Sequence, residues 1–147
     1  MKISNRKAFH NYFLLDRFEA GINLVGAEVK AVRLGHADLS GSFVKVIGSE
    51  AQLVNAKIFP YQYARPESYT PNRTRKLLLH KKQIIALKSK MEGSSLTIVP
   101  VSLYTTHNLI KVELALARAK KKFDKKQAIK TQDIQREIER TLEDRNF

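Results

Sequence analysis

Apolar and polar residues alternate strictly in one segment near the C-terminal end of the chain. Between residues 109 and 117, Lys111 and Glu113 occupy positions that alternate with apolar side chains. A period of two residues is typical of a strand with one buried and one solvated face. We therefore expect an antiparallel strand in this segment. Its predicted core-facing side chains are Ile110, Val112, Leu114 and Leu116.

Other segments also have the composition of strands. Residues 96–104 are apolar on both faces, and Pro100 marks a predicted bulge or a position without a ladder hydrogen bond. Residues 42–47 and 51–58 flank a short turn that contains Gly48, which predicts a hairpin. Two further candidates are residues 17–25, with a bulge expected at Gly21, and residues 76–79.

Two segments have helical patterns instead. Residues 26–35 carry Glu28 in the first turn and basic residues later, the order that the helix macrodipole favours. In residues 81–92 the apolar side chains recur at helical spacing, and the pair His80 and Gln83 suits a helix start. Several short strands with two or three short helices predict a mainly β fold, a small closed or nearly closed antiparallel barrel.

The rest of the chain predicts a loop and a tail. Residues 61–74 contain two prolines and indicate a long surface loop. From residue 125 onward, Ile134, Ile138 and Leu142 form one narrow apolar stripe among charged residues. Three apolar side chains cannot stabilise a lone helix in water. We therefore expect a barrel domain at residues 1–118 and a flexible basic tail at residues 119–147 that becomes helical when docked.

Positive charge is concentrated in two blocks. The chain has 147 residues, a formal net charge of +13 and a pI near 10.1. Residues 65–90 hold eight basic residues against one acid, and residues 118–130 hold seven against one. The remainder is balanced. Two basic blocks on a neutral body predict a polyanionic partner, with nucleic acid favoured over an anionic membrane surface.

Composition argues against most enzymatic chemistry. The absence of cysteine excludes a disulfide framework and a thiolate zinc site. The four histidines are far apart, and Glu28 has no second carboxylate near it in the sequence, so we expect no metal, no cofactor and no enzyme. No apolar run is long enough to span a bilayer, and the N-terminal residues lack the apolar stretch of a signal peptide. We therefore expect a cytoplasmic protein with no membrane partner.

Aromatic residues lie beside basic ones in residues 6–13, 61–76 and 120–126. Bases stack on aromatic faces while Lys and Arg hold the nucleic-acid backbone, so this pairing favours RNA contact. Phenylalanine is usually buried, and we expect five of them to fill the barrel core. These are Phe9, Phe13, Phe18, Phe43 and Phe59. Phe123, which stands among lysines, is expected to be exposed.

Several motifs, in order along the chain, resemble the SmpB (SsrA-binding protein) family. Residues 5–12, 18–22 and 26–33 resemble its N-terminal signature, and residues 73–80 resemble its central block. Residues 111–118 and the run from Asp124 to Lys130 complete the order. The resemblance implies an oligonucleotide-binding-type barrel that binds the tRNA-like domain of tmRNA and brings it to stalled ribosomes in trans-translation. It also implies a non-enzymatic adaptor, which we expect to be a monomer.

The resemblance further implies two sets of contact residues. The RNA-facing surface of the barrel would be Asn5, Arg6, Lys7, His10, Tyr12, Glu28, Lys30, Arg33, Arg73, Arg75 and Lys76. The residues reaching ribosomal RNA at the decoding centre and the empty mRNA channel would be Lys120, Lys121, Lys122, Phe123, Asp124, Lys125, Lys126, Ile129, Lys130, Arg136 and Ile138, of which the last two rest on helical periodicity. Ala119 stands where the family usually has Gly, which predicts a stiffer joint between barrel and tail.

Two other functions fit parts of the pattern. A general single-strand RNA-binding or ribosomal β-barrel would explain the charge and the aromatics without a decoding-centre tail. An RNA-modifying enzyme would use Glu28 as an acid or His10 as a base.

Overall fold

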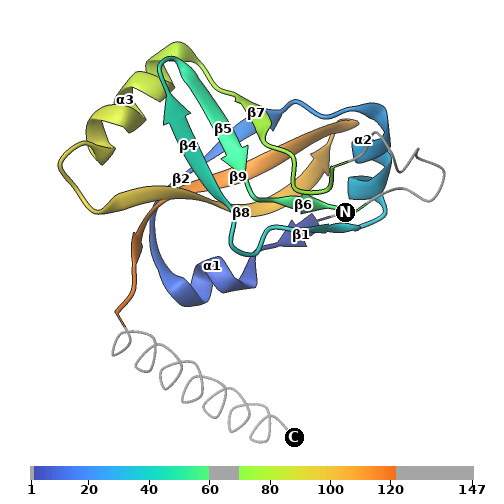
Figure 1. The fold of residues 1–147 in the computed structure, drawn as a ribbon, viewed down its shortest axis with the longest axis horizontal. Helices are drawn as coiled ribbons and strands as arrows, with labels where there is room; N and C mark the ends of the chain where they lie inside the picture. The colour runs from blue at the N-terminus through green and yellow to red at the C-terminus, as the bar shows by residue number, and fades with distance from the viewer. Residues whose placement is uncertain (1, 60–69, 122–147) are drawn as a thin grey trace, which may run out of the picture.

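The computed structural model describes residues 2–59 and 70–121 (Figure 1). Within these ranges, three helices interrupt a series of strands. The helices are α1 (Arg6–Asn11), α2 (Gly26–Arg33) and α3 (Lys81–Met91). The strands are β1 (Lys2–Ser4), β2 (Tyr12–Ile22), β3 (Ala37–Asp38), β4 (Phe43–Ile47), β5 (Glu50–Val54), β6 (Lys57–Ile58), β7 (Arg75–Leu78), β8 (Leu96–Thr106) and β9 (Leu109–Ala119).

The strand pairings close on themselves. The main sheet runs β1-β8-β4-β5-β7-β2-β9, and a further pairing joins β9 back to β8. All of these pairs are antiparallel. The ring of paired strands therefore begins and ends at β8. β1 lies outside this ring and pairs with the second half of β8, while β3 and β6 form a separate pair. This arrangement confirms the mainly β, antiparallel fold with a few short helices.

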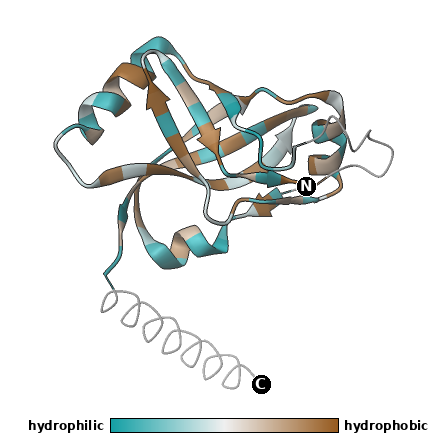
Figure 2. Ribbon diagram, in the orientation of Figure 1, coloured by the Kyte–Doolittle hydropathy of each residue, from teal (hydrophilic) through white to brown (hydrophobic). Residues whose placement is uncertain are grey.

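The core of the barrel contains the residues predicted from the alternation in β9. Val112, Leu114 and Leu116 are buried in the main apolar cluster, and Ile110 packs against it. The opposite face of β9 is also buried near its end, because Ala117 packs with Ala8 of α1 and with Val99. A short helix therefore covers part of the face that the sequence predicts to be solvated. Figure 2 shows apolar and polar stretches following one another along the strands and around α3.

The predicted hairpin forms, but its second strand is interrupted. Residues Gly48 and Ser49 connect β4 to β5, and Gly48 has a φ of +59°, which glycine adopts without strain. The single strand expected at residues 51–58 is wrong. Asn55 adopts a left-handed conformation with φ 67°, so β5 ends at Val54 and β6 turns away to pair with β3.

One of the two predicted bulges is in the expected place. In β8 the register shifts between Pro100 and Ser102, which confirms the bulge at this proline. The bulge expected at Gly21 is wrong, because β2 shifts register between Leu14 and Arg17 instead. Gly21 is needed for close approach, since a Cβ there would lie 3.1 Å from the Cβ of Leu78 on β7.

The helices expected at residues 26–35 and 81–92 are confirmed as α2 and α3, and Gly35 and Gly93 after them have positive φ angles. The sequence patterns do not predict α1.

No helix of the described residues is long and apolar enough to cross a membrane. In the same residues no group of three or more His, Cys, Asp or Glu side chains could hold a metal ion.

The prediction that five phenylalanines fill the core is largely wrong. Phe18 packs against the core and Phe13 is half-buried, but Phe9, Phe43 and Phe59 are 43%, 41% and 45% exposed. Phe43 is exposed because side chains alternate along β4 and its neighbour Val44 takes the buried position. Phe9 lies on α1, which packs on the outside of the barrel through Ala8.

Candidate nucleic-acid interface

Asn5 fixes the N-terminal end of α1. Its side-chain oxygen accepts from the amide of Ala8, and its side-chain nitrogen donates to the carbonyls of Leu39 at 3.3 Å and Pro100 at 2.8 Å. Only 4% of Asn5 is exposed, so its side chain serves the interior of the protein, and its expected contact with RNA stays a prediction. It anchors α1 to β8 and to the residues before β4, and so positions the exposed side chains of that helix.

Basic side chains project from α1 and from the strands beside it. Arg6, Lys7 and His10 are exposed, and Tyr12 is partly buried against the small cluster that contains Ala8. Next to them, guanidinium and ammonium groups lie over aromatic rings, each 5.2 Å from the ring centroid. The pairs are Arg17 with Phe9, and both Arg118 and Lys120 with Phe13.

Glu28 lies in a buried network of charges. Its Oε2 accepts from Arg75 Nε at 2.6 Å, its Oε1 accepts from Arg73 Nη2 at 2.5 Å, and Oε1 also accepts from the amide of Val25 at 3.0 Å. Glu28 and Arg75 are 1% and 0% exposed, so both side chains are enclosed by the protein, and their expected contact with RNA stays a prediction. The guanidinium of Arg75 donates further to the carbonyls of Ala56, Pro71 and Arg73.

This network determines the charge state of Glu28. Burial alone would raise the pKa of its carboxyl, but the hydrogen bonds from Arg73, Val25 and Arg75 outweigh burial and bring the pKa below its ordinary value. Glu28 is therefore an ionised structural anchor. An ionised carboxylate enclosed by two guanidinium groups is also poorly suited to act as the proton-donating acid of an RNA-modifying enzyme.

The anchor connects α2 to the segment that leads into β7. Because Glu28 joins these two segments, it also fixes the position of the exposed or partly exposed cations that they carry at this end of the barrel. Arg73 keeps 40% of its side chain exposed, and Arg33 reaches the carbonyl of Asn108 in the β8–β9 turn at 3.2 Å. Lys30 is exposed on the same helix. The sequence motif at residues 26–33 and the motif at residues 73–80 thus meet in space.

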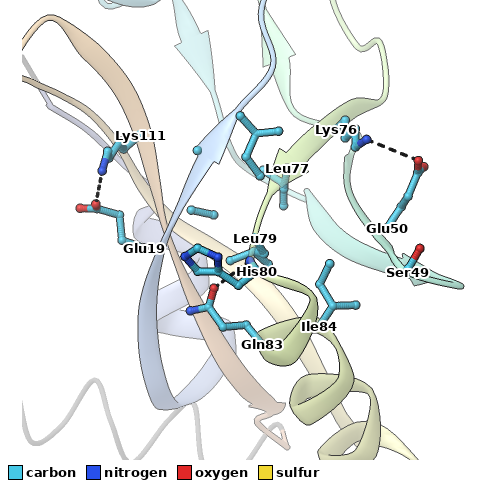
Figure 3. Close-up of a pocket in the computed structure, with 13 residues that line it drawn as sticks. Glu19, Ser49, Glu50, Lys76, Leu77, Leu79, His80, Gln83, Ile84 and Lys111 are labelled. Atoms are coloured by element: carbon cyan, nitrogen blue, oxygen red, sulfur yellow. Dashed lines mark hydrogen bonds and ion pairs between the residues drawn. The ribbon is translucent and has the colours of Figure 1, made fainter.

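An open groove of about 630 Å³ runs between β2, β7 and the start of α3 (Figure 3). It is lined by ion pairs as well as apolar side chains. Lys111 Nζ lies 2.8 Å from Glu19 Oε1, and Lys76 Nζ lies 3.5 Å from Glu50 Oε1. Hydrogen bonds from Lys111 and then Tyr104 hold the pKa of Glu19 below its ordinary value.

His80 stands at the rim of this groove as the residue before α3. Its amide donates to Gln83 Oε1 at 3.1 Å, which confirms the helix start expected from this pair. Leu78 in the wall of the groove is 56% exposed and adds an apolar contact surface to it. Motif reasoning missed Glu19 and Lys111 as groove residues. The only signal was their polar position on strands whose other face is apolar.

The predicted tail contacts mostly lie outside the described residues. Lys120 and Lys121 are described, and the amide of Lys120 donates to the carbonyl of Asn11 at 2.8 Å. The predicted contacts that lie outside are Lys122, Phe123, Asp124, Lys125, Lys126, Ile129, Lys130, Arg136 and Ile138.

A closed antiparallel barrel with exposed cations, exposed aromatic rings and an open polar groove defines a small basic β-barrel of the nucleic-acid-binding kind. The sequence profile of the family described as "SmpB protein" matches residues 2–144. The chain belongs to the SmpB family.

Named relatives cover nearly the whole chain. An SsrA-binding protein of Dehalococcoides mccartyi (strain ATCC BAA-2100 / JCM 16839 / KCTC 5957 / BAV1) is 45% identical over 144 residues, covering 98% of this chain and 84% of the relative. One from Sulfurihydrogenibium sp. (strain YO3AOP1) is 47% identical over 95% of this chain and 91% of its own length. A solved structure described as "tmRNA-SmpB: a journey to the center of the bacterial ribosome" has a chain that is 41% identical, with a TM-score of 0.70 over 87% of this chain and 94% of that chain.

Proposed function

We propose that this chain is an RNA-binding adaptor of trans-translation, which binds the tRNA-like domain of tmRNA and delivers it to stalled ribosomes. The observation that carries the proposal is the extent of the family match, which runs from residue 2 to residue 144. It includes the barrel and most of the predicted tail. A general single-strand RNA-binding protein would be expected to match this chain over the barrel but not over the tail. The cytoplasm, where ribosomes translate, is the compartment in which this adaptor acts.

The exposed residues of the barrel supply the RNA contacts in this proposal. Basic groups on α1, on α2 and before β7 would bind phosphates, and the groove between β2 and α3 would receive nucleotide edges. The residues retained from the predicted set are Arg6, Lys7, His10, Tyr12, Lys30, Arg33, Arg73 and Lys76. Asn5, Glu28 and Arg75 act from the interior by holding α1 and α2 in place.

The tail completes the function in this proposal. The barrel domain ends near residue 118, and residues 119–147 would enter the decoding centre and the empty mRNA channel. The seven basic residues between 118 and 130 suit a path lined by ribosomal RNA. The adaptor acts by binding and placement and carries out no chemical step on the RNA.

The test separates RNA binding from ribosome engagement. Pull-down of the full chain from a bacterial lysate, followed by RNA sequencing, should enrich one tRNA-like species over bulk mRNA. A chain without residues 125–147 should keep nearly the same affinity for that RNA at fixed salt, but should lose ribosome-dependent tagging of stalled peptides.

Two results would count against the proposal. Enrichment of mixed single-stranded RNA would favour the general binding barrel. Chemical change in the bound RNA that His10→Ala abolishes would favour an enzyme.

A further inference from the structure

A second cavity lies where the barrel closes between β4 and β8. Its volume is about 330 Å³, within the range of small-molecule sites, and it shares no lining residue with the groove of Figure 3. The two strands pair at one register position, Val44 with Ile98. Beside that position the strands separate, and the space between them is covered by α1. We call this cavity the seam pocket.

The lining of the seam pocket combines aromatic rings with polar groups. Phe43 and Tyr12 contribute the rings, and Phe43 is 41% exposed. The side chains of Asn11, Ser95 and Thr97 also line it, and none of them makes a hydrogen bond to another described residue. Amide and hydroxyl groups at these positions are therefore available to a ligand.

Among the described residues that line the seam pocket, Lys7 is the charged one. No carboxylate lines it among the residues that the structure describes. Asp38 lies outside the lining, and its pKa is lowered first by hydrogen bonds from Ser40 and also by the charge of Lys7. The basic block that starts at Arg118 passes its edge, because Ala119 lines the pocket and Lys120 bonds to Asn11. In the groove of Figure 3, by contrast, each lysine already faces a glutamate.

An unpaired base in RNA needs a ring to stack on, donors and acceptors for its edge, and a cation for its phosphate. The seam pocket supplies all three. We propose that it binds one unpaired nucleobase of the RNA partner through stacking on Phe43, with Asn11, Ser95 and Thr97 facing the base edge and Lys7 the phosphate. This proposal rests on the proposed function, since it assumes an RNA partner. The base could come from tmRNA or from ribosomal RNA.

The test uses the full chain and two probes, a transcript of the tRNA-like domain of tmRNA and purified small ribosomal subunits. Phe43→Ala should weaken binding to one of the probes by about tenfold or more, the loss typical of removing one base stack. The probe that loses affinity identifies the source of the base. Phe43→Trp should restore affinity. Ile47→Ala is the matched control, since Ile47 lies on the same face of β4 and is 50% exposed.

A second readout locates the base. The photoreactive residue p-benzoylphenylalanine in place of Phe43 should crosslink to one or two nucleotides mapped by primer extension, and in place of Ile47 should not. If wild type and Phe43→Ala bind both probes equally, the seam pocket is not a base site, while the proposed function stands. If wild type binds neither probe, the proposed function fails and this inference fails with it.

The chain's own tail is the alternative occupant of the pocket. Truncation after Lys121 would then raise the affinity of wild type but not that of Phe43→Ala. That result would overturn the proposal.

Discussion

Replacing Glu28 by Gln should destabilise the barrel strongly while preserving the volume of the side chain. Glu28 and Arg75 are 1% and 0% exposed, and two nitrogens of Arg75 lie 2.6 Å from the same carboxylate oxygen. Neutralising one partner leaves a buried guanidinium without its counter-charge, which typically costs about 3–5 kcal/mol. Since small domains have total stabilities of about 5–15 kcal/mol, this is a large fraction of the whole.

Urea unfolding followed by circular dichroism measures this loss directly. Glu50→Gln is the matched control, because Glu50 and Lys76 are 49% and 52% exposed and 3.5 Å apart. An exposed pair of this kind contributes about 0–1 kcal/mol. If Glu28→Gln costs no more than Glu50→Gln, the buried network does not stabilise the fold and the reasoning is refuted.

The same carboxylate predicts a pH dependence. Because the pKa of folded Glu28 lies below the ordinary value of 4.5, the unfolded chain takes up a proton first as pH falls. The stabilisation is therefore complete well above pH 4.5 and is lost as pH falls from there through the lower, folded-state pKa. Glu28→Gln should remove this part of the acid dependence. Identical acid dependence in wild type and variant would contradict the assignment.

Three further changes test other features of the structure. Asn5→Ala should lower the free energy of unfolding by about 2 kcal/mol, since it removes the cap of α1 and one donor to two buried carbonyls; a thermal-unfolding difference below about 0.5 kcal/mol would argue against this anchor. Gly21→Ala should cost about 1–3 kcal/mol by overpacking against Leu78. In a double-mutant cycle with Leu78→Gly, which removes the Cβ at 3.1 Å, the two changes should together cost less than the sum of their separate costs, and additive costs would exclude this contact. Arg118→Ala should reduce the slope of log affinity against log salt by about 1 if its guanidinium contacts a phosphate, and an unchanged slope would place it away from the RNA.

The periodicity of apolar residues was sufficient to predict an element where that element buries one continuous face. β9 alternates apolar and charged side chains from Ile110 to Leu114, and α3 repeats its apolar residues at helical spacing, so both could be predicted from the sequence. The helix α1 could not, because six residues are too few to show periodicity. It is held by the Asn5 cap and by packing on Val99, which lies on a strand far away in the sequence.

The site was predictable in outline but not in its individual contacts. The motifs at residues 26–33 and 73–80 do contribute to one region, but nothing local shows that Glu28 points inward to Arg75, 47 positions away. Residue type was also a poor guide to burial. Phe43 is exposed because of its position in the alternation of β4, and Arg75 is buried because a carboxylate and three carbonyls satisfy its donors.

The position of β9 in the barrel has a consequence for how the protein is made. β9 is the last strand within the described residues, yet it pairs along most of its length with both β2 and β8. Synthesis proceeds from the N-terminus, so β2 is made early and has no pairing with β9 until residues 109–119 have been made. A chain cut short before β9 would carry two unpaired strand edges, the state most exposed to aggregation and proteolysis. The barrel is therefore protected only after residues 109–119 have been made and have paired with β2 and β8.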